Sequence, residues 1–199
     1  MPKTVTTALA AACALIAAAA QAAPVADASG VYVVEPSHTE VLFGISHLGF
    51  STYYGQFPGA SGTLALDAKH PANSKLDISV PVASVMTASP KLNEELAGDQ
   101  WLDAGKYPTM TFHSTKIVPT GPTTADVTGD LTLHGVTHPV TLKATLNKAA
   151  DNPMMKTYSA GFEATGHIKR SDFGVKTYVG PIGDDVTLII SAAFNRKPS

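Results

Sequence analysis

The sequence predicts an all-β protein whose antiparallel sheet closes, or nearly closes, into a barrel of about eight strands. Three observations lead to this fold class. Nearly every segment alternates apolar and polar residues with a period of two, and Gly, Pro, Asn and Asp separate the segments. Only one stretch has a clear helical pattern. The length of 199 residues suits a single domain that can bury a core of its own.

The alternation defines the expected strands, each of which is bounded by turn-forming residues. Short connections between successive strands favour antiparallel neighbours. We expect strands near residues 31–35, 39–49, 55–67, 75–85, 109–118, 124–134, 139–148, 158–169 and 185–195.

The one helical segment lies around residues 89–103. Ser89 suits the capping position, Pro90 suits the first helical position, and Leu92 and Leu96 lie four residues apart on one face. Gly98 ends the helical pattern. No other stretch of the chain combines a start signal, a stop signal and a period near 3.6.

The first 22 residues have the pattern of a secretory signal peptide. Lys3 gives a positive start, and an apolar Ala/Leu/Ile run ends in the small-x-small motif at residues 20–22. A transmembrane helix fits less well because the run is short and no positively charged stop follows it. We therefore expect a signal peptide at 1–22 and one domain at 23–199, and a lipoprotein site at Cys13 stays open.

Charge and cysteine content exclude several classes of partner. Cys13 is the single cysteine, so the expected mature domain has no disulfide and no thiolate metal site. Lys3 is one of only 14 basic residues, against 16 acidic residues, and the basic residues form no cluster. We expect no nucleic-acid partner and no stable membrane insertion.

Two histidines in the segment GDLTLHGVTHPVTLKATL, residues 129–146, raise the question of a metal or catalytic pair. A hairpin that pairs Leu131 with Leu142 places all apolar residues on one face and pairs Asp130 with Lys143 on the other. In this register the histidines at 134 and 138 frame the turn on opposite faces. We therefore expect that they do not share a metal ion.

Enzyme signatures are sparse in the rest of the chain. The sequence has no Gly-x-Ser-x-Gly elbow, no His-Glu-x-x-His helix and no phosphate-binding glycine loop, so no cofactor is expected. By alternation His113 and His167 point to solvent, whereas His47 follows the apolar face inward. A satisfied core histidine is the favoured interpretation of His47, and a three-histidine metal centre stays open.

The inward face of the predicted sheet carries many small side chains. The hairpin contributes Gly129 and Ala144 beside Leu131 and Leu142, and aromatic residues are 7% of the chain. Such a lining leaves room for one apolar guest inside a barrel of this size. A solid hydrophobic core without a ligand is the alternative.

The sequence resembles the YceI-like polyisoprenoid-binding proteins of the bacterial periplasm. The resemblance covers about residues 32–196 and rests on several blocks in order. They are VYVVEPSHTEVLFGISHLGFSTYYGQF, GTLALD, ASVMT, DQWLDAGKYPTMTFHS, VTGDLTLHGVTHPVTL and GHIKRSDFGVKTYVGPIGDDVTLIISAAF. The resemblance implies a periplasmic protein with an eight-stranded antiparallel lipocalin-like barrel and an elongated apolar channel. The implied guest is an isoprenoid, an isoprenoid quinone or a similar long amphiphile.

The resemblance also implies site residues. Those expected at the channel wall or mouth are Phe43, Ile45, His47, Phe50 and Phe57. Those expected to close one side of the channel are Leu96, Trp101, Leu102 and Tyr107. In the block KRSDFG, Phe173 is expected to face the ligand, with structural roles for Arg170 and Asp172. Alternation of the strands adds Phe112, Leu131 and Leu142 to the ligand-binding set.

One departure from the family pattern bears on the ligand's polar end. Relatives often have an Asp and a His before the WLD motif, where this chain has Asn93 and Glu95. Head-group preference therefore stays open at this stage.

Three functional classes stay open in a stated order. The first is a binding protein without chemistry of its own that carries or sequesters the amphiphile. The second is a metal-assisted enzyme that acts on such a lipid. The third is a soluble partner of a membrane electron-transfer protein, which an exposed apolar patch at one rim would favour. A homodimer also stays open.

Overall fold

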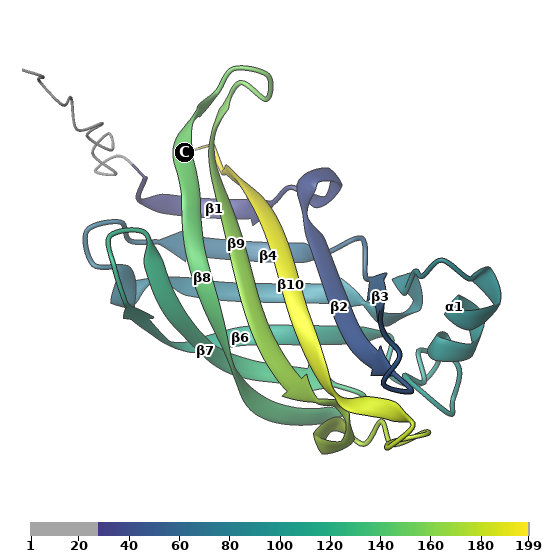
Figure 1. Ribbon diagram of the computed structural model, residues 1–199. Coiled ribbons are helices and arrows are strands. Elements are labelled where there is room, and N and C mark those ends of the chain that lie inside the picture. Colours follow the sequence, from purple (N-terminus) through teal and green to yellow (C-terminus); the bar gives the residue numbers. More distant parts are fainter. Residues whose placement is uncertain (1–27, 199) are drawn as a thin grey trace, which may run out of the picture.

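A computed structural model describes residues 28–198 as a closed all-β barrel with one short α-helix (Figure 1). This confirms the predicted fold class. The expected signal peptide at residues 1–22 and Cys13 lie outside the described residues. Among residues 28–198, no helix is both long enough and apolar enough to span a membrane.

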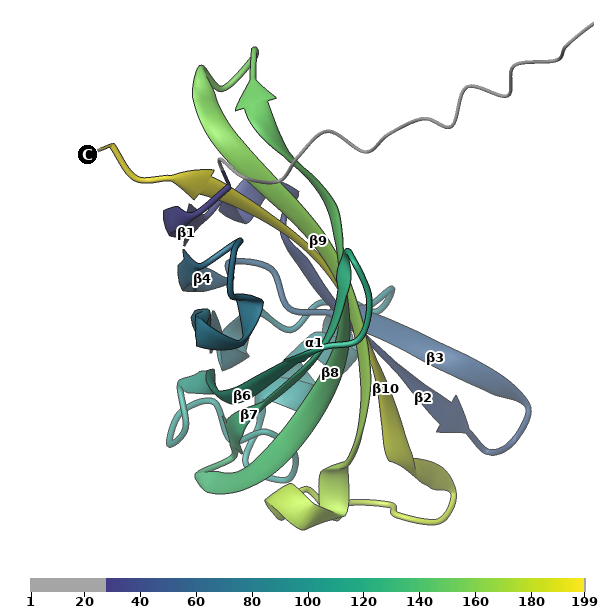
Figure 2. The same ribbon diagram turned by 90° about the vertical axis from the view of Figure 1, so that its left-hand side faces the viewer.

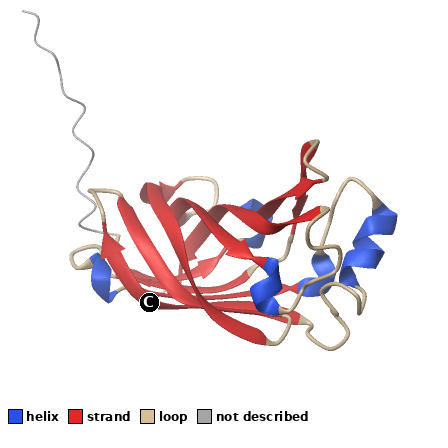
Figure 3. Ribbon diagram, turned by 60° about the horizontal axis from the view of Figure 1, so that its bottom comes forward, coloured by secondary structure: helices blue, strands red, loops and turns tan. Residues whose placement is uncertain are grey.

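The described chain contains ten strands, one α-helix and four 3₁₀ segments. The strands are β1 (Gly30–Val34), β2 (Glu40–His47), β3 (Ser51–Gln56), β4 (Ser61–Leu66), β5 (Lys75–Pro81), β6 (Thr109–Pro119), β7 (Thr124–Leu133), β8 (Val136–Asn152), β9 (Thr157–Lys169) and β10 (Ile182–Arg196). The helical segments are η2 (Pro36–His38), η3 (Pro71–Asn73), η4 (Val82–Ser84), α1 (Pro90–Ala97) and η5 (Arg170–Phe173). Strands form the wall, and the helical segments lie at its ends (Figure 3).

Eight of the strands close the barrel in the order β1-β4-β5-β6-β7-β8-β9-β10, because β1 pairs back with β10. At the seam, Tyr32 pairs with Arg196, whose guanidinium carbon lies 5.4 Å from the Tyr32 ring centroid. The other part of β10 pairs with β2, which pairs in turn with β3. The β2–β3 hairpin therefore extends beyond the closed wall (Figure 2).

Two predicted strands are shorter than expected. The stretch 55–67 is divided, because β3 ends at Gln56 and β4 begins at Ser61. Pro58 and Gly59 lie between them, and the φ of +82° at Gly59 is a turn conformation. The stretch 75–85 remains a strand only to Pro81, and η4 follows.

The predicted register of the β7–β8 hairpin is wrong. Leu131 pairs with His138 and Val127 pairs with Leu142, so each residue of β8 faces a β7 residue four positions earlier than expected. The turn contains only two residues, His134 and Gly135, with φ values of +53° and +74°. Such positive values at both positions are those of a tight type I′ hairpin, which glycine favours.

The register error has one visible cost and leaves the faces unchanged. Lys143 pairs with Asp126, whereas Asp130 pairs with Pro139, so the predicted Asp130–Lys143 pair does not form. A shift of four residues is even, and side chains alternate with a period of two. The apolar residues of the hairpin therefore still face the interior, as predicted.

The core consists of two clusters of buried side chains. One cluster contains Tyr32, Val34, Ala60, Leu64, Val80, Ala160 and Phe194. The other contains Phe112, Val127, Leu133, Val140, Leu142 and Phe173. Leu76, Ile78 and Met110 are partly buried and pack against both clusters. The interior between these contacts is hollow, which decides against the solid core considered above.

Candidate ligand-binding site

The barrel encloses a cavity of about 670 Å³. The size lies within the range typical of sites for small organic molecules. Ten of the thirteen sequence-predicted site residues line it: Phe43, Ile45, His47, Phe57, Leu96, Trp101, Leu102, Phe112, Leu131 and Leu142. The inward stripe of β10 also lines it, through Val186, Leu188, Ile190, Ala192 and Phe194.

A row of small side chains explains why the interior stays open. Ala125 of β7 pairs with Ala144 of β8, which pairs with Ala164 of β9, and all three line the cavity. The row continues through Ile190 of β10 to Val41 of β2. Three adjacent strands thus contribute only methyl groups at this level, and the space that larger side chains would fill remains free.

One end of the barrel, which we call the α1 end, is covered by the segment 82–108 and by η5. The Ser89 hydroxyl accepts a hydrogen bond from the Leu92 amide at 3.3 Å, and Pro90 begins the helix, as the sequence predicts. The helix turns Leu92 and Leu96 toward the cavity. Trp101, which follows the helix, is buried and lines the same space.

Arg170 fixes the loop that follows η5. Its guanidinium is 4% exposed and donates hydrogen bonds of 2.8–3.1 Å to four backbone carbonyls, those of Val175, Thr177, Ile182 and Gly183. Burial lowers the pKa of Arg170 from its usual value. These contacts fit the structural role that the family resemblance implies for Arg170.

The polar side chains of the lining are concentrated at the α1 end. Among the described residues that line the cavity, His47, Glu95 and Arg170 are the only histidine or charged side chains. The hydroxyl groups of Tyr53 and Tyr178 come from the same end. His47 is exposed and lies 6.4 Å from the Tyr53 ring, so it belongs to the rim and not to the core.

Three predicted site residues do not reach the cavity. Phe50 is 90% exposed at the β2–β3 turn, where the strand alternation has already ended. Tyr107 packs against His134 with ring centroids 4.8 Å apart. Phe173 is 1% exposed and packs edge-on against His138 at 5.3 Å, so it supports the end of the barrel from below the lining.

The two hairpin histidines meet η5 and not each other. His134 Nδ1 lies 3.2 Å from the carbonyl oxygen of Phe173, and His138 Nε2 lies 3.1 Å from that of Asp172. Each nitrogen can donate to its carbonyl, which fastens the hairpin to η5. Within residues 28–198, no three His, Cys, Asp or Glu side chains gather into a set that could hold a metal ion.

The sequence analysis missed several lining residues. Tyr178 and Ile182 come from the loop before β10, which has no periodic pattern. Tyr53 lies in β3 and alternates with exposed residues, while Leu92 was visible as the partner of Leu96 in the helical spacing. At the opposite end, the lining includes Pro71 and the segment 121–125. Only tertiary pairing brings that segment to the cavity.

Comparison with known proteins places this geometry in a family. The sequence matches the YceI-like domain over residues 32–194. The chain belongs to the YceI-like domain family. It is 44% identical to Protein YceI of Escherichia coli over 157 residues, which are 79% of this chain and 81% of that protein. It is 42% identical over 162 residues to a UPF0312 protein of Pseudomonas savastanoi, covering 80% of this chain and 83% of that one.

Solved structures of the YceI-like family share the fold. Burkholderia cenocepacia BcnA superposes with a TM-score of 0.73 at 26% identity, covering 80% of this chain and 98% of that one. The Campylobacter jejuni YCEI protein gives a TM-score of 0.69 at 31% identity, covering 77% and 90%. A polyisoprenoid binding domain from Saccharophagus degradans gives 0.64 at 14% identity, covering 83% and 98%, and that likeness concerns the fold alone.

Proposed function

We propose that this YceI-like protein binds one long apolar chain inside its barrel and carries or sequesters it in the periplasm. The proposed ligand is an isoprenoid, an isoprenoid quinone or a similar amphiphile. The single observation that supports this most is the cavity of about 670 Å³ whose wall is apolar except at one end. The Saccharophagus degradans domain of similar fold is described as polyisoprenoid binding, which points to the same ligand class.

The shape of the lining favours an elongated guest. Lining residues run from His47 and Tyr178 at the α1 end to Pro71 and Thr123 at the opposite end. An extended chain that buries several hundred Å² would gain about 25 cal/mol per Å² of apolar surface. Binding costs include the lost freedom of the chain, so a guest that fills the length of the cavity is favoured over a short one.

The polar groups of the α1 end suit the head of an amphiphile. The hydroxyls of Tyr53 and Tyr178 and the imidazole of His47 are on the same side of the lining as Glu95. In the proposed complex these groups hydrogen bond to the head group, and the chain lies along the alanine row. The protein does no chemistry on its guest in this proposal.

The identity of the guest is tested by mass spectrometry of an organic extract from gently purified protein. A stoichiometric isoprenoid, quinone or long-chain amphiphile is the expected result. An extract without such a molecule, together with no binding of geranylgeraniol by the purified protein, would contradict the proposal. Retention of stoichiometric zinc or iron after dialysis would favour the metal-assisted enzyme instead.

A matched pair of variants tests whether the guest lies in the cavity. Ile45→Asp places a charge on the lining, whereas Ser46→Asp places the same charge at the adjacent exposed position. Geranylgeraniol binding is expected to weaken at least tenfold in the first variant and to stay unchanged in the second, with both proteins folded. Phe43→Asp is expected to behave like Ile45→Asp. Equal affinity in all three variants would place the guest elsewhere.

The proposed location has its own test. Residues 1–22 are expected to direct export and to be removed. Fractionation of producing cells, with the N-terminal sequence of the recovered protein, checks both points. Intact protein in the cytoplasmic fraction would contradict them.

A further inference from the structure

Four exposed apolar side chains lie on two neighbouring loops at the α1 end. Leu48 and Phe50, in the β2–β3 turn, are 53% and 90% exposed, and Tyr178 and Val179, before β10, are 65% and 41% exposed. We call these four residues the rim patch. The Leu48 amide donates a hydrogen bond of 2.9 Å to the carbonyl of Pro181, which joins the two loops. The sequences of these loops, LGF and YVGP, contain no charged residue.

The rim patch continues directly into the cavity lining. Tyr178 belongs to both surfaces, since it is exposed at the rim and also lines the cavity. His47, which precedes Leu48, pairs with Ile182 across β2 and β10, and both residues line the cavity. An apolar chain moving between the interior and the outside would therefore meet apolar side chains along this route.

We propose that the rim patch docks on the surface of a lipid bilayer, so that an apolar guest passes between the membrane and the barrel. This inference rests on the function proposed above, because it takes a membrane-dissolved chain as the guest. A direct passage avoids exposing each methylene of the chain to water. Phe and Tyr side chains suit insertion at the level of the lipid head groups.

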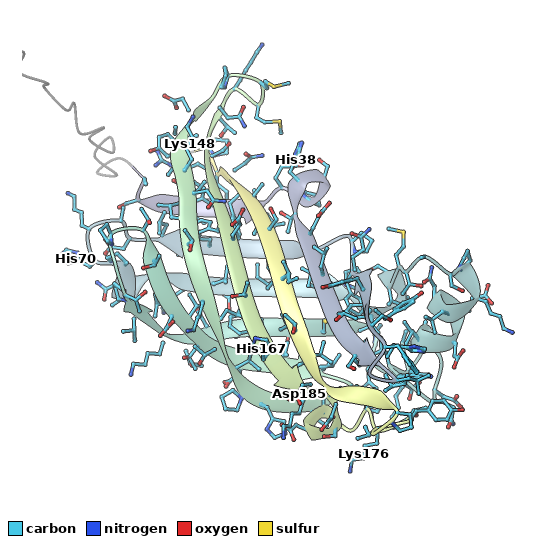
Figure 4. All side chains as sticks on the ribbon, in the orientation of Figure 1. His38, His70, Lys148, His167, Lys176 and Asp185 are labelled. Carbon is cyan, nitrogen blue, oxygen red and sulfur yellow. The ribbon has the colours of Figure 1, made fainter. Side chains whose placement is uncertain are left out.

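The charges around the rim patch indicate how docking works. Lys176 and Asp185 lie at the same end as the patch (Figure 4), so charges of both signs flank it. The whole chain has a formal net charge of −2. Docking is therefore driven by insertion of apolar side chains and does not depend on negatively charged lipid.

A bilayer fits the shape of the rim patch better than a protein partner does. The exposed apolar residues are on two loop tips at the end of the barrel, and they do not form a groove or a flat face. A stable protein interface buries about 1,600 Å² and needs a packed centre with a polar rim. Two adjacent tips without charge can instead enter the head-group layer without a complementary partner surface.

The opposite end of the barrel supplies a control of equal exposure. Met154 is 90% exposed, like Phe50, but it lies in the β8–β9 turn near the end of β10 that is remote from the rim patch. The 15 residues of β10 separate the two ends by roughly 45 Å at the usual rise per residue. Nonspecific hydrophobic adhesion would involve both ends, whereas docking involves only one.

The single tryptophan of the sequence serves as a position probe. Trp101 lies at the α1 end with its ring centroid 6.2 Å from that of Tyr178. Docking through the rim patch places Trp101 close to the membrane. Energy transfer from Trp101 to dansyl-labelled phosphatidylethanolamine in vesicles is then expected, and it would be weak if the opposite end made the contact.

The test compares the purified wild-type protein with the double variant L48S/F50S and with M154S. Binding is measured by cosedimentation and energy transfer with vesicles of phosphatidylcholine, and with vesicles of phosphatidylethanolamine and phosphatidylglycerol. Wild type and M154S are expected to bind both vesicle types with similar affinity. L48S/F50S is expected to bind at least tenfold more weakly, because burying one such side chain accounts for a factor of this size.

Two outcomes would overturn the docking proposal. One is equal binding by L48S/F50S and M154S, and the other is wild-type protein that binds neither vesicle type, which would leave a protein partner as the occupant. A separate titration with geranylgeraniol in vesicle-free solution distinguishes this failure from failure of the proposed function. L48S/F50S is expected to keep wild-type affinity there, whereas a wild-type protein that binds no geranylgeraniol would contradict the proposed function itself.

Discussion

The guanidinium of Arg170 lies over the indole of Trp101, with its central carbon 5.4 Å from the ring centroid. The same guanidinium donates to four backbone carbonyls of the segment between Val175 and Gly183. One side chain therefore joins the loop that carries Tyr178 to the segment that follows α1. The geometry of the α1 end depends on this junction, because the two segments are 77 residues apart where Thr177 donates to Gln100.

We predict that Arg170→Lys destabilises the protein by about 2–4 kcal/mol. An ammonium group cannot reach all four carbonyls, and the buried carbonyls that lose a charged donor account for a loss of this size. Urea unfolding measures the effect, with Lys169→Arg at the neighbouring exposed position as the control. A loss below about 1 kcal/mol for Arg170→Lys would mean that the loop is held by other contacts.

A second prediction concerns the β7–β8 turn. Gly135 has a φ of +74°, and a Cβ at this position would lie 2.4 Å from Cε1 of Tyr107. Gly135→Ala is therefore expected to destabilise the protein by about 1–3 kcal/mol through backbone strain and displacement of the Tyr107 ring. Gly105→Ala is the control, because a Cβ there meets no atom within 4 Å. Equal thermal midpoints for both variants would contradict the predicted strain.

A third prediction concerns acid stability. Hydrogen bonds to Asp184 from the Ser171 hydroxyl at 2.7 Å and the Ser171 amide at 2.9 Å lower the pKa of Asp184. Since this carboxyl binds protons more weakly in the folded state, its contribution is complete above the unfolded pKa of about 3.9 and is lost as the pH falls through the folded pKa. Asp184→Asn is expected to reduce stability near neutral pH and to bring wild type and variant closer together below about pH 4. A difference between the two proteins that stays constant from neutral pH into this acid range would argue against the linkage.

How much of the fold follows from sequence depends on what a period of two can specify. Alternation identified the strands and the faces of residues such as Leu131 and Leu142, since each face is decided within one strand. It could not fix the β7–β8 register, because every even shift keeps the same faces. The positive φ of His134 was the missing signal: the dipeptide His134-Gly135 forms the tight turn, and Gly135 next to a polar residue is the local indication of it.

The site was predictable to the extent that it lies on strands. Inward residues of β2, β6, β7 and β8 reached the cavity as expected, whereas Phe50 lies beyond the end of its strand and Tyr107 packs on a turn from another part of the chain. Tyr178 was missed for the same reason. Its position is set by Arg170 and Trp101, which are contacts between loops, and no local pattern encodes them.

A fourth prediction tests the alanine row as the origin of the cavity. Ala164→Phe adds a ring at the level where Ala144 and Ala125 leave space, so the guest loses part of its channel. We expect geranylgeraniol affinity to fall at least tenfold, with a stability change of at most about 1–3 kcal/mol because the ring enters an existing cavity.

The control for this variant is Thr165→Phe, which adds the same ring at the next residue, on the exposed outer face of β9. Affinity is expected to remain at the wild-type level there, because alternation directs the ring away from the cavity. Affinity is measured from the change in Trp101 fluorescence and independently by calorimetry. If Ala164→Phe folded and still bound geranylgeraniol as tightly as Thr165→Phe, the guest would not pass the alanine row, and an elongated binding mode would be excluded.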